Sequence, residues 1–154
     1  MRETLNAKRP ASTTWLGYGG LLPFVGLAVL MAIDAQRQEL WSRALIAYGA
    51  VILSFVGALH WAFAMVLPGL SSTQRRNRWI WSTVPALLAW PALWLPSAAA
   101  IAVLVVGFVL HYDQDRRLAA TACEALPAWY LPLRLQLTTV ACVSLALAAL
   151  ITAS

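Results

Sequence analysis

Five long stretches of the chain are almost free of charged side chains, and no other feature limits the possible folds as strongly. Hydrophobic residues make up 61% of the sequence and charged residues only 11%, whereas a soluble domain carries about 25% charged residues. About 20 consecutive apolar residues make a helix that crosses a bilayer. We therefore predict an all-α, polytopic membrane protein built as a bundle of five transmembrane helices. The expected spans are 15–33, 44–67, 79–95, 97–112 and 131–151.

These spans place residues 15–152 in one membrane domain that follows a cytoplasmic N-terminal tail, residues 1–14. The 154 residues leave no room for a soluble catalytic domain beside the five spans. The first apolar stretch is too long for the core of a cleaved signal peptide and lacks small residues at the expected cut. We expect it to be retained as a span.

The basic residues are divided unequally between the two sides of such a bundle. Nine of the eleven fall on the side of the N-terminus, namely Arg2, Lys8, Arg9, Arg75, Arg76, Arg78, Arg116, Arg117 and Arg134. Only Arg37 and Arg43 fall on the other side. Because cytoplasmic loops carry an excess of Lys and Arg, we predict a bacterial inner-membrane protein with a cytoplasmic N-terminus and a periplasmic C-terminus. In an organelle, the matrix would take the place of the cytoplasm.

Four polar or basic connections are expected to join the five spans. They are a hairpin at 34–43, an arginine-rich loop at 70–78, a tight turn at 96–97 and a long loop at 111–130, in which 117–125 is expected to form a short interfacial helix. Pro85 and Pro91 predict a kink in the third span. Most Trp residues stand near the ends of spans, as interfacial anchors do. Cys123 and Cys142 stand at different depths, which predicts two free thiols.

Small residues recur at helical spacing along the second span. Ala50, Ser54 and Gly57 are separated by three or four positions, a pattern that allows helices to approach closely. We expect a packing seam here, with Gly19 and Gly20 of the first span as the opposing surface.

His60 lies inside the same span and is the first candidate for a functional side chain. A group that can ionise at membrane depth is costly to bury without a partner. His60 either bonds to a neighbouring helix or serves as a proton relay, an axial haem ligand or a donor to a quinone carbonyl. His111 is expected at the end of the fourth span, at a depth that looks different from that of His60. Two histidines on separate helices are nevertheless one way to hold a haem.

The segment from His111 to Asp115 holds a histidine and two carboxylates at alternate positions. They would converge on a metal only if the backbone were extended. We expect instead that Asp113 and Asp115 pair with Arg116, Arg117 or Arg134 at the level of the headgroups. Arg134 enters the fifth span and must therefore reach the interface or meet an acid. The expected ligand-binding residues are His60, Ser54, Trp61, His111, Asp113 and Arg134.

Catalytic and nucleic-acid-binding patterns are missing from the sequence. There is no GxSxG, no metal-type His or Cys spacing and no glycine-rich phosphate loop, and Ser54 and His60 fall on different helix faces. No basic stripe with interleaved aromatics lies outside the spans. We expect no enzyme, no metal site and no nucleic-acid partner; the sequence identifies no cofactor.

Several sequence blocks resemble a known family. The stretches GYGGLLPF from Gly17, SFVGALHW from Ser54 and LPAWYLPLR from Leu126 are similar to the transmembrane protein 69-like family. This resemblance covers nearly the whole chain after residue 14 and implies a polytopic inner-membrane protein, with no activity, substrate or catalytic residue to carry over. A weaker likeness, of architecture alone, is to the tryptophan-rich sensory proteins, which bind porphyrin or sterol-like ligands.

Two functions follow as expectations. The first is a non-enzymatic membrane protein that binds a lipophilic small molecule or acts as a subunit associated with a membrane-protein partner. The alternative is a small transporter or proton-coupled permease that works as a homo-oligomer, with His60, Asp34 and Arg134 along the path. A haem-containing redox enzyme is a third class. Every reading has the lipid bilayer as a partner.

Overall fold

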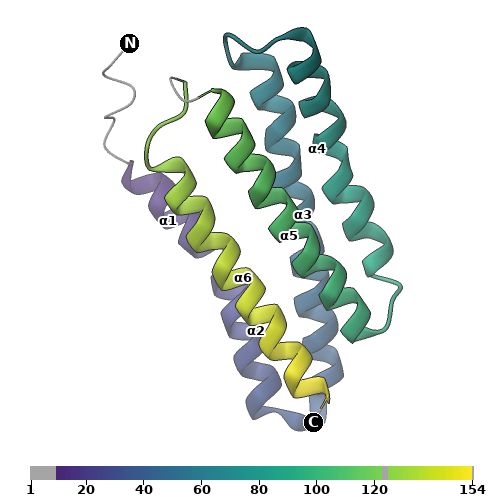
Figure 1. Ribbon diagram of the computed structural model, residues 1–154. Helices are drawn as coiled ribbons and strands as arrows, with labels where there is room; N and C mark the ends of the chain where they lie inside the picture. The colour runs from purple at the N-terminus through teal and green to yellow at the C-terminus, as the bar shows by residue number, and fades with distance from the viewer. Residues whose placement is uncertain (1–9, 123–124, 154) are drawn as a thin grey trace.

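The computed structural model describes residues 10–122 and 125–153, and within these residues all regular secondary structure is helical (Figure 1). The elements are α1 (Ala11–Gly19), α2 (Leu22–Ile33), the short 3₁₀ helix η1 (Ala35–Arg37), α3 (Gln38–Val66), α4 (Ser72–Ala92), α5 (Ser97–Thr121) and α6 (Tyr130–Ala153). Because α1 and α2 follow one another closely, the helices form five rods side by side, and the predicted all-α bundle is confirmed. Arg2, Lys8, Arg9 and Cys123 lie outside the described residues, whereas Cys142 is a free thiol.

The first expected span is made of two helices. The chain turns at Gly20 and Leu21, and Pro23 stands in the first turn of α2, where its missing N–H costs no helical hydrogen bond. The hydroxyl of Tyr48 on α3 donates a hydrogen bond to the carbonyl of Gly20 at 2.7 Å. This bond satisfies a carbonyl at the break and holds it against α3.

Helix α4 begins seven residues before the expected start of the third span. Ser71 Oγ accepts a hydrogen bond from the backbone N–H of Gln74, and Gln74 Oε1 accepts one from the N–H of Ser71. This capping box starts the helix. The expected loop at 70–78 is therefore wrong, because Arg75, Arg76 and Arg78 all lie on α4.

A tight turn joins α3 to α4. Gly69 has a φ of 76°, in the left-handed region that favours glycine. The guanidinium of Arg75 then donates hydrogen bonds to the carbonyls of Ala64 and Leu67. These contacts satisfy the end of α3 and hold the two helices as an antiparallel pair.

Helix α5 continues nine residues beyond the expected end of the fourth span, through Thr121. The expected long loop at 111–130 is wrong in its first half, and the separate interfacial helix at 117–125 is replaced by the last turn of α5. No Gly or Pro occurs between residues 108 and 126, so nothing in the sequence stops the helix. On this helix His111 and Asp115 share one face, and Asp113 between them points to another.

Four segments are long and apolar enough to cross a membrane, namely Ala11–Ile33, Ala35–Val66, Ser97–Thr121 and Tyr130–Thr152. Helix α4 is not among them because its first two turns carry three arginines. Large apolar side chains such as Leu22, Val51, Phe55 and Leu150 are exposed on the outside of the bundle. In water they would form an unusually large apolar surface, whereas in a bilayer they contact lipid. The chain is a helical membrane protein.

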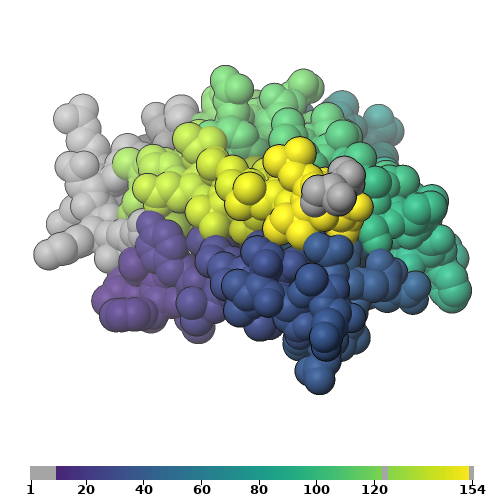
Figure 2. Space-filling model, turned by 90° about the horizontal axis from the view of Figure 1, so that it is seen from below, coloured from purple at the N-terminus to yellow at the C-terminus, as the bar shows by residue number. Residues whose placement is uncertain are grey.

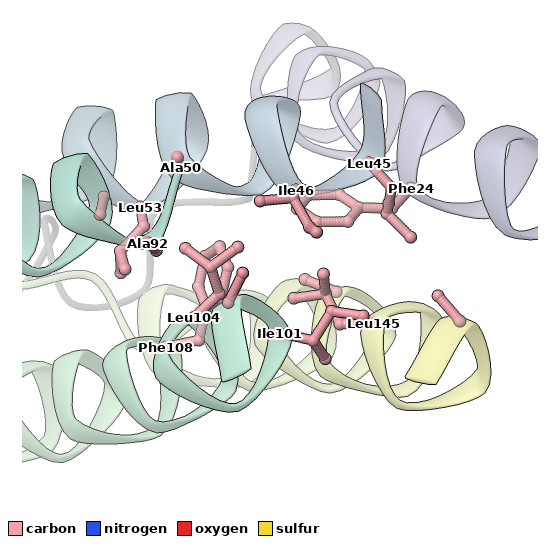
Figure 3. Packing of buried hydrophobic residues seen from close by; sticks show 14 of the residues in the cluster. Phe24, Leu45, Ile46, Ala50, Leu53, Ala92, Ile101, Leu104, Phe108 and Leu145 are labelled. Atoms are coloured by element: carbon pink, nitrogen blue, oxygen red, sulfur yellow. The ribbon is translucent and has the colours of Figure 1, made fainter. Parts of the chain in front are cut away.

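The core lies between α2, α3, α5 and α6. Phe24, Leu45 and Leu53 from the first two of these helices face Leu104 and Leu145 from the other two (Figure 3). A view along the bundle from the end of α6 shows α6 lying between α5 and the pair α2–α3 (Figure 2). Helix α4 packs on the far side against α3 and α5 (Figure 1).

The small-residue seam of α3 packs mainly against helices other than the expected one. A Cβ atom on Gly57 would lie 2.7 Å from Cγ of Pro85 on α4. Across α5, a Cβ atom on Gly107 would lie 2.6 Å from a methyl group of Leu53. Gly19, in contrast, has no neighbour within 4 Å that its Cβ would meet. Gly20 contacts α3 through Tyr48, so only half of the expected opposing surface is present.

We predict that Gly57→Ala destabilises the bundle by about 1–3 kcal/mol, because the rigid Pro85 ring cannot move away from the added methyl group. The matched control is Gly26→Ala, whose Cβ would meet nothing within 4 Å and which should change stability by less than about 0.5 kcal/mol. Unfolding in detergent micelles measures both. Equal stability of the two variants would contradict the close α3–α4 contact.

Candidate functional site

A fully buried carboxylate, Asp115 on α5, is the centre of a polar cluster inside the bundle. Its exposed fraction is 0%. It lies near one end of the bundle, where α3 ends, α4 begins, α5 ends and α6 begins; because six described arginines gather there, we call it the arginine-rich end (upper end in Figure 1). A charge at this depth requires partners.

Three side chains from two other helices donate hydrogen bonds to Asp115. Arg134 Nε on α6 lies 2.7 Å from Oδ2, and the Tyr130 hydroxyl on α6 lies 2.9 Å from Oδ1. His60 Nε2 on α3 lies 3.1 Å from Oδ1. The guanidinium balances the carboxylate charge, and the three donors satisfy both oxygens. The carboxylate therefore ties α3, α5 and α6 together.

His111 extends the cluster to α4. The Trp81 indole N–H donates to His111 Nδ1 at 3.2 Å. Because indole can only donate, Nδ1 must be the unprotonated nitrogen, and the neutral ring carries its proton on Nε2. That atom lies 3.8 Å from Asp115 Oδ2 and has no hydrogen-bond partner among the described residues.

Arg78 on α4 adds a second buried guanidinium. Its exposed fraction is 8%, and Nη1 donates to the backbone carbonyl of Gln114 at 3.0 Å and to Gln114 Oε1 at 3.4 Å. Both of these acceptors, the two oxygens of Gln114, are neutral. Arg78 therefore joins α4 to α5 next to the polar cluster without forming an ion pair among the described residues.

Three of the six residues expected at a ligand site meet here. His60, His111 and Arg134 all surround Asp115, and the imidazole rings lie edge to face with centroids 5.0 Å apart. The two histidines are therefore at the same depth, which corrects the expectation that their depths differ. Axial ligands lie on opposite faces of a haem, and two rings in contact leave no space for a macrocycle between them.

The other three expected residues lie elsewhere. Ser54 is half-buried and its hydroxyl donates to the carbonyl of Ala50 on its own helix at 2.8 Å. Trp61 is 51% exposed on the lipid-facing surface, tilted against Trp79. Asp113 forms an ion pair with Arg117 one turn away, at 2.7 Å and near the surface. None of the three contributes a recorded contact to the polar cluster.

Asp34, an expected member of a transport path, is also remote from the cluster. It lies at the end of α2, where its Oδ2 accepts a hydrogen bond from Trp41 Nε1 at 3.2 Å. That is the opposite end of the bundle from the arginine-rich end. The structure therefore joins His60 and Arg134 through Asp115 but leaves Asp34 apart from them.

The side chains of His60, His111 and Asp115 offer three possible metal-ligand atoms within 4.8 Å of one another. Their hydrogen bonds fit a metal poorly. Nε2 of His111 must carry a proton while Trp81 donates to Nδ1, and Arg134 places a positive charge on the same carboxylate that a cation would need. The arrangement fits a hydrogen-bonded charge pair of Asp115 and Arg134 with two imidazole rings packed beside it.

An apolar cavity of about 180 Å³ lies next to the polar cluster, between α1, α2, α3, α5 and α6. Its walls are aliphatic and aromatic side chains together with Gly17 and Gly20, where the first segment breaks. Arg134 and Thr138 from α6 are its polar lining residues. No hydrogen bond joins the Thr138 hydroxyl or the two terminal amino groups of Arg134 to another described residue.

Asp115, Tyr130, Trp81 and Arg78 belong to the site, although none of them was among the six expected residues. One signal for Asp115 was present in the sequence, since His111 and Asp115 are four positions apart in a stretch without helix breakers. Tyr130 and Trp81 look like interfacial anchors in the sequence. Their side chains instead donate hydrogen bonds inside the bundle.

Comparison with known proteins gives matches over almost the whole chain. The sequence profile described as a protein of unknown function (DUF3429) matches residues 9–150. Transmembrane protein 69 of Xenopus tropicalis is 36% identical over 143 residues, which cover 88% of this chain and 53% of that protein. Transmembrane protein 69 of Mus musculus is 29% identical over 143 residues, with 91% and 55% covered. The chain thus spans about half the length of these curated relatives. No solved structure matches.

We predict that Asp115→Asn lowers the free energy of unfolding by about 3–5 kcal/mol, because it leaves the buried Arg134 guanidinium without its counter-charge. Asp113→Asn is the matched control: it removes the same charge two residues away from an ion pair whose side chains are 42% and 67% exposed. That pair should contribute less than about 1 kcal/mol. The measurement is unfolding by denaturing detergent, and similar losses in both variants would contradict the central role of Asp115.

Proposed function

The chain belongs to the family of proteins of unknown function DUF3429, and within that family we propose that it is a non-enzymatic membrane protein that binds a lipophilic small molecule. The observation that carries this proposal is the apolar cavity beside Arg134. Its lining is almost wholly apolar, with polar groups only on α6. Binding pockets for small molecules combine an apolar wall with a few polar groups that fix orientation.

The polar side of the cavity favours a ligand with a hydrogen-bond acceptor. Nε of Arg134 donates its hydrogen bond to Asp115, and the carboxylate balances the charge of the guanidinium. The two terminal amino groups of Arg134 are then available to a ligand. A carbonyl or ester oxygen fits this pair better than a second anion, because a second anion would lie close to the Asp115 carboxylate. The Thr138 hydroxyl offers one further donor. The ligand body would lie against Phe24, Phe108 and Leu137.

The absence of an activated nucleophile supports a role in binding. The ionisable groups around Asp115 are used in hydrogen bonds to one another, and no Ser or Cys hydrogen-bonds to His60 or His111 among the described residues. The binding role requires no second chain. We propose that any association with a membrane-protein partner, or with a second copy of this chain, takes place through the lipid-facing surface.

A proton-coupled transporter is the second candidate, favoured by one observation. Among the described residues, His60 Nδ1 and His111 Nε2 have no hydrogen-bond partner and lie in the same buried cluster. Intramembrane histidine and carboxylate groups form proton relays in transporters. Because Asp34 lies at the other end of the bundle, a path between Asp34 and Arg134 has no contact to support it. The geometry favours binding over transport.

We also propose that the arginine-rich end faces the cytoplasm, or the matrix in an organelle. The described arginines at that end are six, against Arg37 and Arg43 at the other. The prediction uses chains in which Cys123 and Cys142 are replaced by Ser. A membrane-impermeant thiol reagent added to spheroplasts of a bacterial host should label Gln36→Cys in η1 and leave Ser71→Cys unlabelled until the membrane is opened. Labelling of Ser71→Cys but not of Gln36→Cys would contradict this orientation and place the arginine-rich end outside.

The ligand proposal predicts that the protein purified in mild detergent carries a lipophilic molecule, identified by mass spectrometry of solvent extracts. Ala141→Leu, which fills the cavity from α6, should reduce the bound amount per protein strongly. Ala146→Leu, on the lipid-facing side of the same helix, should not. Thr138→Val should weaken binding by a factor of about 2–10, the effect of one hydrogen bond.

Equal occupancy in Ala141→Leu and Ala146→Leu would contradict binding in the cavity. A chain that carries no lipophile in any variant would contradict the proposal as a whole and leave proton-coupled transport as the better explanation.

A further inference from the structure

A second cleft, separate from the apolar cavity, opens between α4 and α5 at the arginine-rich end. Its volume is about 360 Å³, and Gln74, Asn77, Arg78, Gln114 and Arg117 line it. It shares no lining residue with the apolar cavity. The cleft is lined mainly by polar side chains and the apolar cavity mainly by hydrophobic ones, so we expect the two to bind different classes of ligand.

The cleft has two kinds of wall along α4. Gln74, Asn77 and Arg78 come first, and Ile80 and Trp81 follow. Because α4 begins at the arginine-rich end, the polar wall lies toward the membrane surface and the apolar wall lies deeper. This is the arrangement that a phospholipid presents, with a headgroup at the surface and acyl chains below.

Arg78 supplies the reason for an anion in the cleft. Its guanidinium is buried, and its recorded partners are the backbone and side-chain oxygens of Gln114, which are neutral. The carboxylate of Asp115 is held by Arg134, and that of Asp113 by Arg117, in ion pairs that do not include Arg78. A buried cation is costly without a counter-charge. The Asp115 carboxylate attracts Arg78 electrostatically, but its ion pair is with Arg134, so two buried guanidinium groups share one carboxylate.

The charge around the cleft is positive as a whole. Among the described residues, the arginine-rich end carries six arginines against Asp113 and Asp115. Such an excess attracts anionic lipids of the cytoplasmic leaflet, and basic pockets between transmembrane helices bind their headgroups. A guanidinium also pairs with phosphate oxygens through two parallel hydrogen bonds.

From these observations we propose that the α4–α5 cleft binds the phosphate group of an anionic phospholipid, with Arg78 as the buried counter-charge and Arg117 at the rim. Gln74 and Asn77 donate hydrogen bonds to the phosphate or to the headgroup hydroxyls. The acyl chains leave the cleft over Ile80 and Trp81. The site is independent of the proposed ligand in the apolar cavity.

The test is native mass spectrometry of the detergent-purified full chain, titrated with phosphatidylglycerol, with phosphatidylcholine or with inorganic phosphate. We expect phosphatidylglycerol to bind more tightly than phosphatidylcholine, and Arg78→Gln to weaken its binding about tenfold, the effect of one charge-assisted contact. Arg76→Gln is the matched control, because Arg76 is exposed on the same helix at the same end but does not line the cleft. It should change binding less than about twofold.

Two further variants make the test independent of folding. Arg117→Gln alters an exposed side chain at the rim and should also weaken phosphatidylglycerol binding. It therefore tests the cleft even if Arg78→Gln is too unstable to measure. Asp113→Asn removes the carboxylate that competes for Arg117 and should strengthen phosphatidylglycerol binding. A melting temperature for each variant identifies any change that comes from unfolding.

Three results would overturn the proposal. Equal losses in Arg78→Gln and Arg76→Gln would mean general attraction to a basic surface rather than a built site. Equal affinity for the two phospholipids would remove the need for a net negative charge. Displacement of phosphatidylglycerol by inorganic phosphate at millimolar concentration would assign the cleft to free phosphate instead of lipid.

Discussion

The carboxylate of Asp115 determines how four helices of this protein fit together. It receives hydrogen bonds from His60 on α3 and from Tyr130 and Arg134 on α6, while it stands on α5. His111, one turn before it, carries the same network to Trp81 on α4. In a bilayer no water replaces such partners. Any sliding or rotation of one helix would break bonds to the others, so the polar cluster fixes their register in a way that apolar packing alone does not.

Much of the architecture was readable from the sequence, and the errors have common physical causes. The apolar stretches identify the rods, because burial in lipid requires them. The predicted helix ends differ from the observed ends where charged residues continue a helix: Ser71 caps α4 before its arginines, and α5 continues past Asp115 because no helix-breaking residue follows. A prediction based only on the absence of charged residues assigns such charged helical turns to loops. Helix propensity and capping residues, read in the same stretches, would have corrected them.

The site was harder to predict than the fold. His60, His111 and Arg134 were expected to matter because each is polar at membrane depth. Their meeting at one carboxylate depends on which helices are neighbours, and contacts 55 and 19 residues apart leave no local pattern. Ser54 and Trp61 stand close to His60 in the sequence but face elsewhere. Tyr130 and Trp81 are of the residue types that serve as interfacial anchors and stand near helix ends in the sequence. Their side chains instead point into the bundle, where they donate hydrogen bonds to Asp115 and His111.

The break between α1 and α2 has a consequence for how molecules would reach the interior. Helix α1 is only nine residues long and has no buried residue, whereas Leu16 and Gly17 on it form part of the cavity wall. Elements with so few internal contacts separate from a fold at the lowest free-energy cost. We therefore expect α1 to be the part of the cavity wall that opens most easily, which would admit a lipophilic ligand directly from the surrounding lipid.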